Sequence, residues 1–149
     1  MSTTLSARPG VQGIDPRGPQ VAAGITTVVL AAVLLLPQPL AVIVLGVQAL
    51  VFAVGATRGV QHAPYAWVFR TLVRPRLQPP ADLEDPAPPR FAQAVGLVFV
   101  LVALVGFATG VTLLGQVAIG FALVAALLNA VFRFCLGCEL YLLLKRFAH

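Results

Sequence analysis

The stretch VAAGITTVVLAAVLLLPQPLAVIVLGVQALVFAVGAT, residues 21–57, decides the fold. It contains two uncharged apolar runs, each close to the roughly 20 residues that a helix needs to cross a bilayer. Only Pro37, Gln38 and Pro39 separate the two runs, which predicts a tight turn between antiparallel helices. Two more apolar runs follow residue 90, with an uncharged turn around Gly115 and Gln116. The sequence therefore predicts four spans, at about residues 20–36, 40–57, 91–114 and 116–134.

The composition is that of an integral membrane protein. Apolar residues make up 59% of the 149 residues and charged residues 10%, whereas a soluble domain carries about 25% charged residues. Every backbone group in lipid needs a partner, and four spans are too few to close a barrel, so the spans are expected to be helices. The predicted fold is an all-α, four-helix membrane bundle forming a single domain from residue 20 to residue 149. The first span is expected to be retained, because its flanks do not resemble a signal-peptide cleavage site.

The basic residues predict the orientation. They lie before the first span, between the second and third, and at or after the end of the fourth, whereas the two short turns contain no lysine or arginine. By the positive-inside rule, residues 1–19, the central segment and the C-terminus are cytoplasmic in a multi-pass protein of the cell membrane. The net charge of +5 is explained by these flanks facing an anionic leaflet, so nucleic acid is not an expected partner.

The central segment has two parts. Residues 63–77, APYAWVFRTLVRPRL, mix aromatic residues with arginines, which predicts an amphipathic segment lying on the lipid headgroups. Its candidate membrane-surface residues are Tyr65, Trp67, Arg70, Arg74 and Arg76. The alternative is a tethered loop without a membrane role. Residues 78–90, QPPADLEDPAPPR, are proline-rich and predict an extended linker.

A weak internal repeat runs through the chain. Asp15, Pro16, Pro19 and Ala22 recur 70 residues later as Asp85, Pro86, Pro89 and Ala92. The same offset places residues 65–77 over residues 135–147. This pattern predicts two parallel helical hairpins, each followed by an amphipathic segment and related by an axis along the membrane normal. Coincidence in a proline-rich composition is the alternative.

The only two cysteines are Cys135 and Cys138, in a C-terminal segment at residues 135–147. A charge at mid-bilayer costs about 2.5–3.5 kcal/mol, so Arg133 is expected to end the fourth span and to leave both cysteines at the cytoplasmic edge. A break near Gly137 is expected. In a regular helix the two Cβ atoms would lie roughly 5–6 Å apart, farther than the 3.8 Å or so of a disulfide. A first turn or a kink would close this gap.

This spacing suggests a thiol site. Cys135 is the candidate nucleophile, because a helix N-terminus and the nearby Arg133 favour its thiolate. Cys138 is the candidate resolving thiol and Glu139 the candidate proton relay. In the cytoplasm such a pair is expected to rest reduced. The alternative makes the cysteines apolar packing residues, with Arg133 an interfacial anchor and Glu139 its counter-ion.

The sequence gives weaker support for a metal site or a dimerisation motif. Zinc needs four ligands, and only His62 and His149 could join the cysteines within one chain, so neither a metal nor another cofactor is predicted. Gly106 and Gly110 form a G-x-x-x-G pair in the third span. We interpret this pair as allowing close helix packing within the monomer, with dimerisation as the alternative.

Three stretches resemble one known family: GIDPRGP at residues 13–19, PYAWVFRTLVRPRLQPPADLEDPAPPRFAQAVGLVF at 64–99 and LNAVFRFCLGCELYLLLKR at 128–146. They are similar to the small four-helix bacterial membrane proteins grouped as domain of unknown function 4395, whose most specific motif is F-x-F-C-x-G-C-E-x-Y. Genes of that family often neighbour genes for thioredoxin-like proteins and sulfurtransferases, which implies thiol–disulfide or sulfane-sulfur traffic. The family commonly has glycine at the position of Arg133, so the resemblance does not extend to that side chain.

The leading hypothesis is therefore a relay in which Cys135 and Cys138 exchange a disulfide or carry sulfane sulfur with a soluble thioredoxin-like or rhodanese-like partner. The second hypothesis is a non-catalytic membrane scaffold or assembly subunit whose cysteines are structural. A small transporter is a third idea, supported by the repeat alone.

Overall fold

The structure is a computed structural model that describes residues 13–148, so most of the predicted N-terminal tail and His149 lie outside the described residues. Its long helices are α2 (Arg17–Leu35), α3 (Gln38–Arg58), α5 (Ala87–Ala108), α6 (Thr112–Phe132) and α7 (Leu136–Ala148). Between α3 and α5 lie a 3-10 turn (Val60–His62), α4 (Pro64–Val68), a π-helical turn (Phe69–Val73) and a second 3-10 turn (Arg74–Arg76). Over the described range the chain is all-helical, with one isolated β-bridge.

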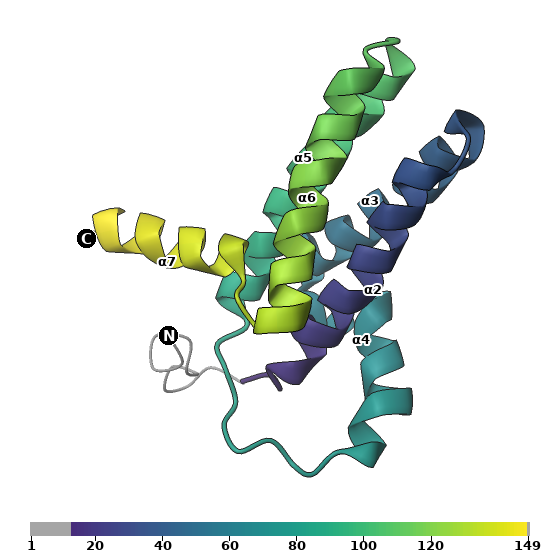
Figure 1. The fold of residues 1–149 in the computed structure, drawn as a ribbon. Coiled ribbons are helices and arrows are strands. Elements are labelled where there is room, and N and C mark those ends of the chain that lie inside the picture. Colours follow the sequence, from purple (N-terminus) through teal and green to yellow (C-terminus); the bar gives the residue numbers. More distant parts are fainter. Residues whose placement is uncertain (1–12, 149) are drawn as a thin grey trace.

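Helices α2, α3, α5 and α6 are each long and apolar enough to cross a membrane, with mean hydropathies of 1.8, 2.3, 2.4 and 2.0. The predicted all-α four-helix bundle is confirmed. Both helical hairpins turn at the same end of the bundle, whereas α4, α7 and the linker lie at the opposite end (Figure 1). This arrangement is consistent with a multi-pass membrane protein.

The turn between α5 and α6 differs from the sequence expectation. The structure places it at residues 109–111, where Gly110 adopts a φ of 84°, rather than at Gly115 and Gln116. Gly115 lies inside α6 because the two helices approach closely there: a Cβ on Gly106 would lie 2.8 Å from the Gly115 nitrogen. Gly106 thus packs within the monomer, and Gly110 serves the turn.

The core lies where α2 packs on α6 and α3 packs on α5, with α5 and α6 in contact at the centre. Small side chains such as Ala41, Ala103 and Ala118 alternate there with larger ones such as Leu30 and Ile119. Close approach through small residues is the usual basis of helix packing in membranes.

The two halves of the chain meet at equivalent residues. The backbones of Ile14 and Glu84, 70 positions apart, exchange two hydrogen bonds of 2.9 and 2.8 Å. One residue later, Asp15 Oδ1 accepts the N–H of Arg17 at 3.0 Å and Asp85 Oδ1 accepts the N–H of Ala87 at 2.9 Å. Each aspartate caps the first helix of its half. Reciprocal pairing of equivalent residues is the pattern expected for two copies related by a pseudo-two-fold axis.

The same relation holds for the second helix of each half. The Gln20 side chain of α2 donates to the Ala130 carbonyl near the end of α6 at 2.9 Å. At the equivalent position of α5, the Arg90 guanidinium donates to the Ala56 carbonyl at 2.7 Å and to the Thr57 carbonyl, near the end of α3. Carbonyls that the helix ends leave free are satisfied in both copies. The internal repeat in the sequence is therefore accompanied by similar contacts at the helix ends of the two halves.

Helix α7 follows a sharp break after α6 and projects sideways from the bundle (Figure 1). The break lies at residues 133–135, just before Gly137. Arg133 has a left-handed conformation, with φ 57° and ψ 26°, and its N–H and that of Phe134 donate back to the carbonyls of Asn129 and Leu128. A left-handed residue is a common way to end a helix. Gly137 instead packs in the first turn of α7, where an added Cβ would lie 2.6 Å from Ala92 of α5.

Candidate functional site

Cys135 and Cys138 lie at the beginning of α7. Cys135 directly precedes the helix and Cys138 belongs to its first turn. The two residues form a disulfide, with Cα atoms 5.1 Å apart. The prediction that the pair rests reduced is therefore wrong for this structure, whereas the expectation that a first turn brings the sulfurs together is met. A regular helix interior would have held them too far apart.

The helix N-terminus makes the environment of Cys135 favourable to negative charge. The backbone N–H of Cys138 donates a hydrogen bond to Cys135 Sγ at 3.1 Å. The positive end of the dipole of α7 points the same way. Both effects favour a thiolate at Cys135 when the disulfide is opened, and a thiolate is the reactive form of cysteine.

The two sulfurs differ in exposure. Cys138 is 3% exposed, whereas Cys135 is half-buried. Cys135 is therefore the more accessible of the two cysteines, and Cys138 faces the interior. The roles predicted from the sequence, with Cys135 as the attacked or attacking sulfur and Cys138 as the resolving one, stay predictions.

A cavity of about 650 Å³ lies directly against the disulfide, between α2, α5, α6 and α7. Both cysteines line it, together with aromatic and aliphatic side chains such as Phe99, Phe121 and Leu140. A few polar side chains also face this space: Gln20, Glu84, Gln93, Asn129 and Arg133. A concave apolar site with a few converging polar groups is the usual form of a small-molecule site. We call it the disulfide cavity.

Arg133 lies at the rim of the disulfide cavity but does not pair with Glu139. Its Nε donates to Gln20 Oε1 at 3.0 Å, and within residues 13–148 neither an ion pair nor a hydrogen bond links Arg133 to Glu139. Glu139 is not among the residues lining the cavity, and its Oε1 is buried without a hydrogen-bond partner in the described chain. Three of the four predicted site residues therefore line the disulfide cavity, and Glu139, which follows Cys138 in the first turn of α7, does not.

Glu84 is a cavity residue that the sequence analysis did not single out. Burial raises the pKa of its carboxyl, and the charge of Arg133 acts against that rise. Its side chain enters the site because its backbone pairs with Ile14. A sequence signal existed, since Glu84 occupies the repeat position that Ile14 fills in the first half.

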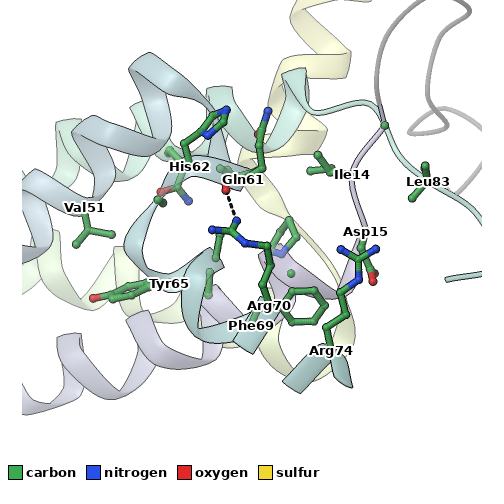
Figure 2. A pocket seen from close by; sticks show the side chains of 18 residues that line it. Ile14, Asp15, Val51, Gln61, His62, Tyr65, Phe69, Arg70, Arg74 and Leu83 are labelled. Atoms are coloured by element: carbon green, nitrogen blue, oxygen red, sulfur yellow. Dashed lines mark hydrogen bonds between the residues drawn. The ribbon is translucent and has the colours of Figure 1, made fainter. Parts of the chain in front are cut away.

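The central segment lies on α2 and forms a second cavity of about 420 Å³, which Figure 2 shows. Tyr65 points inward, and its hydroxyl donates to the buried Gln48 Oε1 of α3 at 2.6 Å. Burial raises the pKa of Tyr65. Its predicted contact with the membrane surface stays a prediction, and the structure adds this contact with α3. Phe69 is also buried, against Gly18 of α2.

The other candidate surface residues of this segment are exposed. Trp67 is 59% exposed, and Arg70, Arg74 and Arg76 lie on the outside at the same end of the bundle as the linker. The Arg70 guanidinium donates to the Gln61 carbonyl at 2.6 Å, which fixes its direction (Figure 2). These four residues stay predicted membrane-surface contacts.

Within the described chain no three His, Cys, Asp or Glu side chains converge as a metal site requires. His62 lines the second cavity, away from the cysteines, and His149 lies outside the described residues.

Comparison with known proteins gives one match. The sequence model of a family described as Domain of unknown function (DUF4395) matches residues 14–146. No curated protein and no solved structure matches the chain.

Proposed function

This chain belongs to the DUF4395 family, and from the geometry of its C-terminal site we propose that it is a membrane-bound thiol–disulfide relay centred on Cys135 and Cys138. One observation carries the proposal: the disulfide lies at the N-terminus of α7, with the Cys138 N–H on Cys135 Sγ. A buried structural disulfide does not need a stabilised sulfur, whereas a relay needs a good leaving group and nucleophile.

The proposed partner is a soluble thioredoxin-like or rhodanese-like protein. A thiolate of the reduced partner attacks Cys135 Sγ, which is the more exposed sulfur. A mixed disulfide forms, the bond to Cys138 breaks, and Cys138 leaves as a thiolate that takes up a proton. The partner's second thiol then attacks its own mixed disulfide and releases Cys135, whose thiolate is stabilised by the helix N-terminus. The partner ends as a disulfide and this chain as a dithiol; the reverse sequence reduces the partner.

Two further residues have proposed supporting roles. Arg133 contributes positive charge at the rim of the disulfide cavity, where its guanidinium is held by Gln20. Glu139, next to Cys138 in the first turn of α7, is the proposed proton acceptor for the resolving thiol. The relay is proposed to face the cytoplasm, with both termini there and the four long helices in the cell membrane, because the basic flanks favour that orientation.

The alternative function is a non-catalytic scaffold. The observation that favours it is the burial of Cys138, because a disulfide inside a first turn also fixes the start of a helix. The exposed Trp67 and the neighbouring arginines would then hold the membrane surface or an acidic partner.

Redox titration of the intact protein separates these two functions. Wild type and Cys135→Ala are equilibrated in a series of thiol buffers and labelled with a mass-tagging alkylating reagent. The relay predicts that the two thiols titrate together at a defined potential. It also predicts that Cys138→Ala, mixed with oxidised thioredoxin, accumulates a mixed disulfide: the Cys135 thiolate breaks the thioredoxin S–S bond, and this chain has no second thiol to resolve the product. A pair that stays closed to every reductant and traps no partner would leave the scaffold.

A further inference from the structure

We propose that the disulfide cavity binds a membrane quinone, a lipid-soluble oxidant that accepts two electrons and two protons from the Cys135–Cys138 pair. The inference rests on the proposed thiol–disulfide function and adds the second redox partner. A soluble protein would exchange with Cys135 from outside, and the quinone would meet the sulfurs from the cavity.

The first argument is the location of Cys138. Its side chain is 3% exposed, yet it lines a cavity of about 650 Å³. Pockets for small ligands typically have volumes of about 300–1,000 Å³. A molecule in this space touches both sulfurs, whereas a docked protein reaches mainly Cys135. The oxidant that reaches Cys138 is therefore a small molecule and not a protein.

The second argument is the route into the cavity. Phe121 and Phe132 line it and are also 64% and 69% exposed on the outer surface of α6. Both belong to a helix that is apolar enough to span a membrane. The wall of the cavity is thus continuous with the surface that faces lipid, and a hydrophobic molecule can enter from the bilayer.

The third argument is the lining. Phe99 and Phe121 form a tilted aromatic pair with centroids 6.4 Å apart, a suitable wall for a planar ring. Gln93 and Asn129 line the cavity, and their side-chain amides make no hydrogen bond to another residue of the described chain. Amide N–H groups can donate to the two carbonyls of a quinone, and the amide oxygens can accept from the hydroxyls of the hydroquinone. A plain lipid tail would leave these groups without partners.

The reaction balances without another reactant. The two thiols lose two electrons and two protons, and one S–S bond forms. The two quinone carbonyls gain the electrons and protons and become hydroxyls. Together with exchange at Cys135, electrons would pass from a soluble dithiol protein to the quinone in the membrane.

Full-length protein in lipid nanodiscs tests the inference. The protein is reduced, freed of reductant and mixed with decylubiquinone, whose fully substituted ring does not alkylate thiols. We expect one hydroquinone for each disulfide formed, followed by quinone absorbance and by mass-tag alkylation. Cys138→Ala should give none. Ala125→Phe, which fills the cavity, should slow the reaction by about tenfold or more, the scale on which shape in an apolar pocket discriminates.

Matched controls make the outcome specific. Val124→Phe alters the neighbouring residue, which is 55% exposed and outside the cavity lining, and should leave the rate unchanged. Asn129→Leu removes one amide at nearly constant size, and it should slow the reaction even where Ala125→Phe does not fold. Wild type that the quinone does not oxidise, or equal rates in wild type, Ala125→Phe and Asn129→Leu, would overturn the quinone site.

Reduction by thioredoxin is measured in the same samples, so the two proposals fail separately. If thioredoxin reduces the disulfide but decylubiquinone does not re-form it, the quinone site is wrong and the relay stands. If the quinone oxidises the dithiol but no soluble dithiol protein reduces it again, the proposed relay partner is wrong and the quinone site stands.

Discussion

Arg133 shows how a single residue positions the site. It is the one non-glycine residue with positive φ in residues 13–148, and its left-handed conformation ends α6 and redirects the chain into α7. Glycine adopts this conformation without steric cost, whereas other residues pay for the Cβ. The resemblance noted from the sequence, in which glycine commonly occupies this position, agrees with the backbone geometry. The arginine therefore adds its contact with Gln20 to a position that glycine also fits.

We predict that Arg133→Gly keeps the thermal stability of the protein close to that of wild type, because backbone relief offsets the lost hydrogen bond to Gln20. Arg133→Val should instead lower the free energy of unfolding by about 1–2 kcal/mol, because a β-branched residue is strained at positive φ. Thermal unfolding in detergent, followed by circular dichroism, measures both. Equal destabilisation by glycine and valine would show that the side chain, not the backbone, ends the helix.

Asp15 is the residue whose ionisation should affect stability. Burial alone would raise the pKa of its carboxyl, but hydrogen bonds from the side chain and backbone of Arg17, with the charges of Arg17 and Arg74, hold the pKa below its ordinary 3.8. A carboxyl with a depressed pKa stabilises the fold above its ordinary pKa, and this stabilisation is lost as the pH falls through the folded-state value.

We therefore predict that the wild type loses stability below about pH 4, near the ordinary pKa of an aspartate. Asp15→Asn should be less stable at neutral pH and should show a weaker fall between neutral and acidic pH. Unfolding temperatures across a pH series test this. An unchanged acid dependence in Asp15→Asn would assign the effect to another carboxyl.

At the scale of elements, the contact between α7 and α5 sets the shape of the disulfide cavity. Gly137 lies against the Ala92 backbone and Tyr141 packs on Phe91 with ring centroids 5.6 Å apart. An added Cβ at position 137 would lie 2.6 Å from both Ala92 Cα and Ala92 Cβ, so α7 would have to move. Gly120 of α6 is the matched control, because a Cβ there meets nothing within 4 Å.

We predict that Gly137→Ala lowers the free energy of unfolding by about 1–3 kcal/mol, the usual cost of overpacking. In reduced protein it should also raise the alkylation rate of Cys138, because displacement of α7 exposes that buried sulfur. Gly120→Ala should change neither property. If Cys138 of Gly137→Ala is alkylated at the wild-type rate, the packing of α7 on α5 is not what buries Cys138.

The elements differ in how well the sequence predicts them. Spans α2 and α3 follow directly from their apolar length and the prolines between them. The turn after α5 does not, because Gly106, Gly110 and Gly115 all permit a turn and only the packing of Gly106 on Gly115 selects among them. The contact of Tyr65 with Gln48 could not be predicted for a similar reason: aromatic residues among arginines are typical of an interfacial helix, and the buried Gln48 lies in another span.

At the scale of the whole molecule, the internal repeat gives each half of the chain a cavity. The repeat offset places Tyr65 and Val68 at the positions of Cys135 and Cys138. Correspondingly, the two cavities share equivalent walls, with Ile14, Ala22 and Val51 in one and Glu84, Ala92 and Phe121 in the other. The repeat was readable in the sequence, but the cavities arise from packing between the halves. The oxidised state of the cysteines was not readable, because it depends on a pairing that only the helix start creates.

The orientation of the whole molecule decides which compartment the disulfide meets. The cytoplasm keeps thiols reduced, and disulfides there are usually transient and catalytic, whereas an oxidising compartment preserves structural ones. The two hairpin turns and the disulfide lie at opposite ends of the bundle (Figure 1). One labelled position at each end is therefore enough to fix the orientation of the site.

We predict that the disulfide end faces the cytoplasm. In a background carrying Cys135→Ala and Cys138→Ala, Thr109→Cys tests the α5–α6 turn and Gln78→Cys tests the linker; both positions are exposed. An impermeant thiol reagent added to intact cells should label Thr109→Cys and should reach Gln78→Cys only after the membrane is permeabilised, because the basic flanks hold that end inside. If only Gln78→Cys is labelled in intact cells, the orientation is the opposite of the predicted one. The disulfide would then lie in an oxidising compartment, where it can persist as a structural bond, and the scaffold would become the better account of the two cysteines.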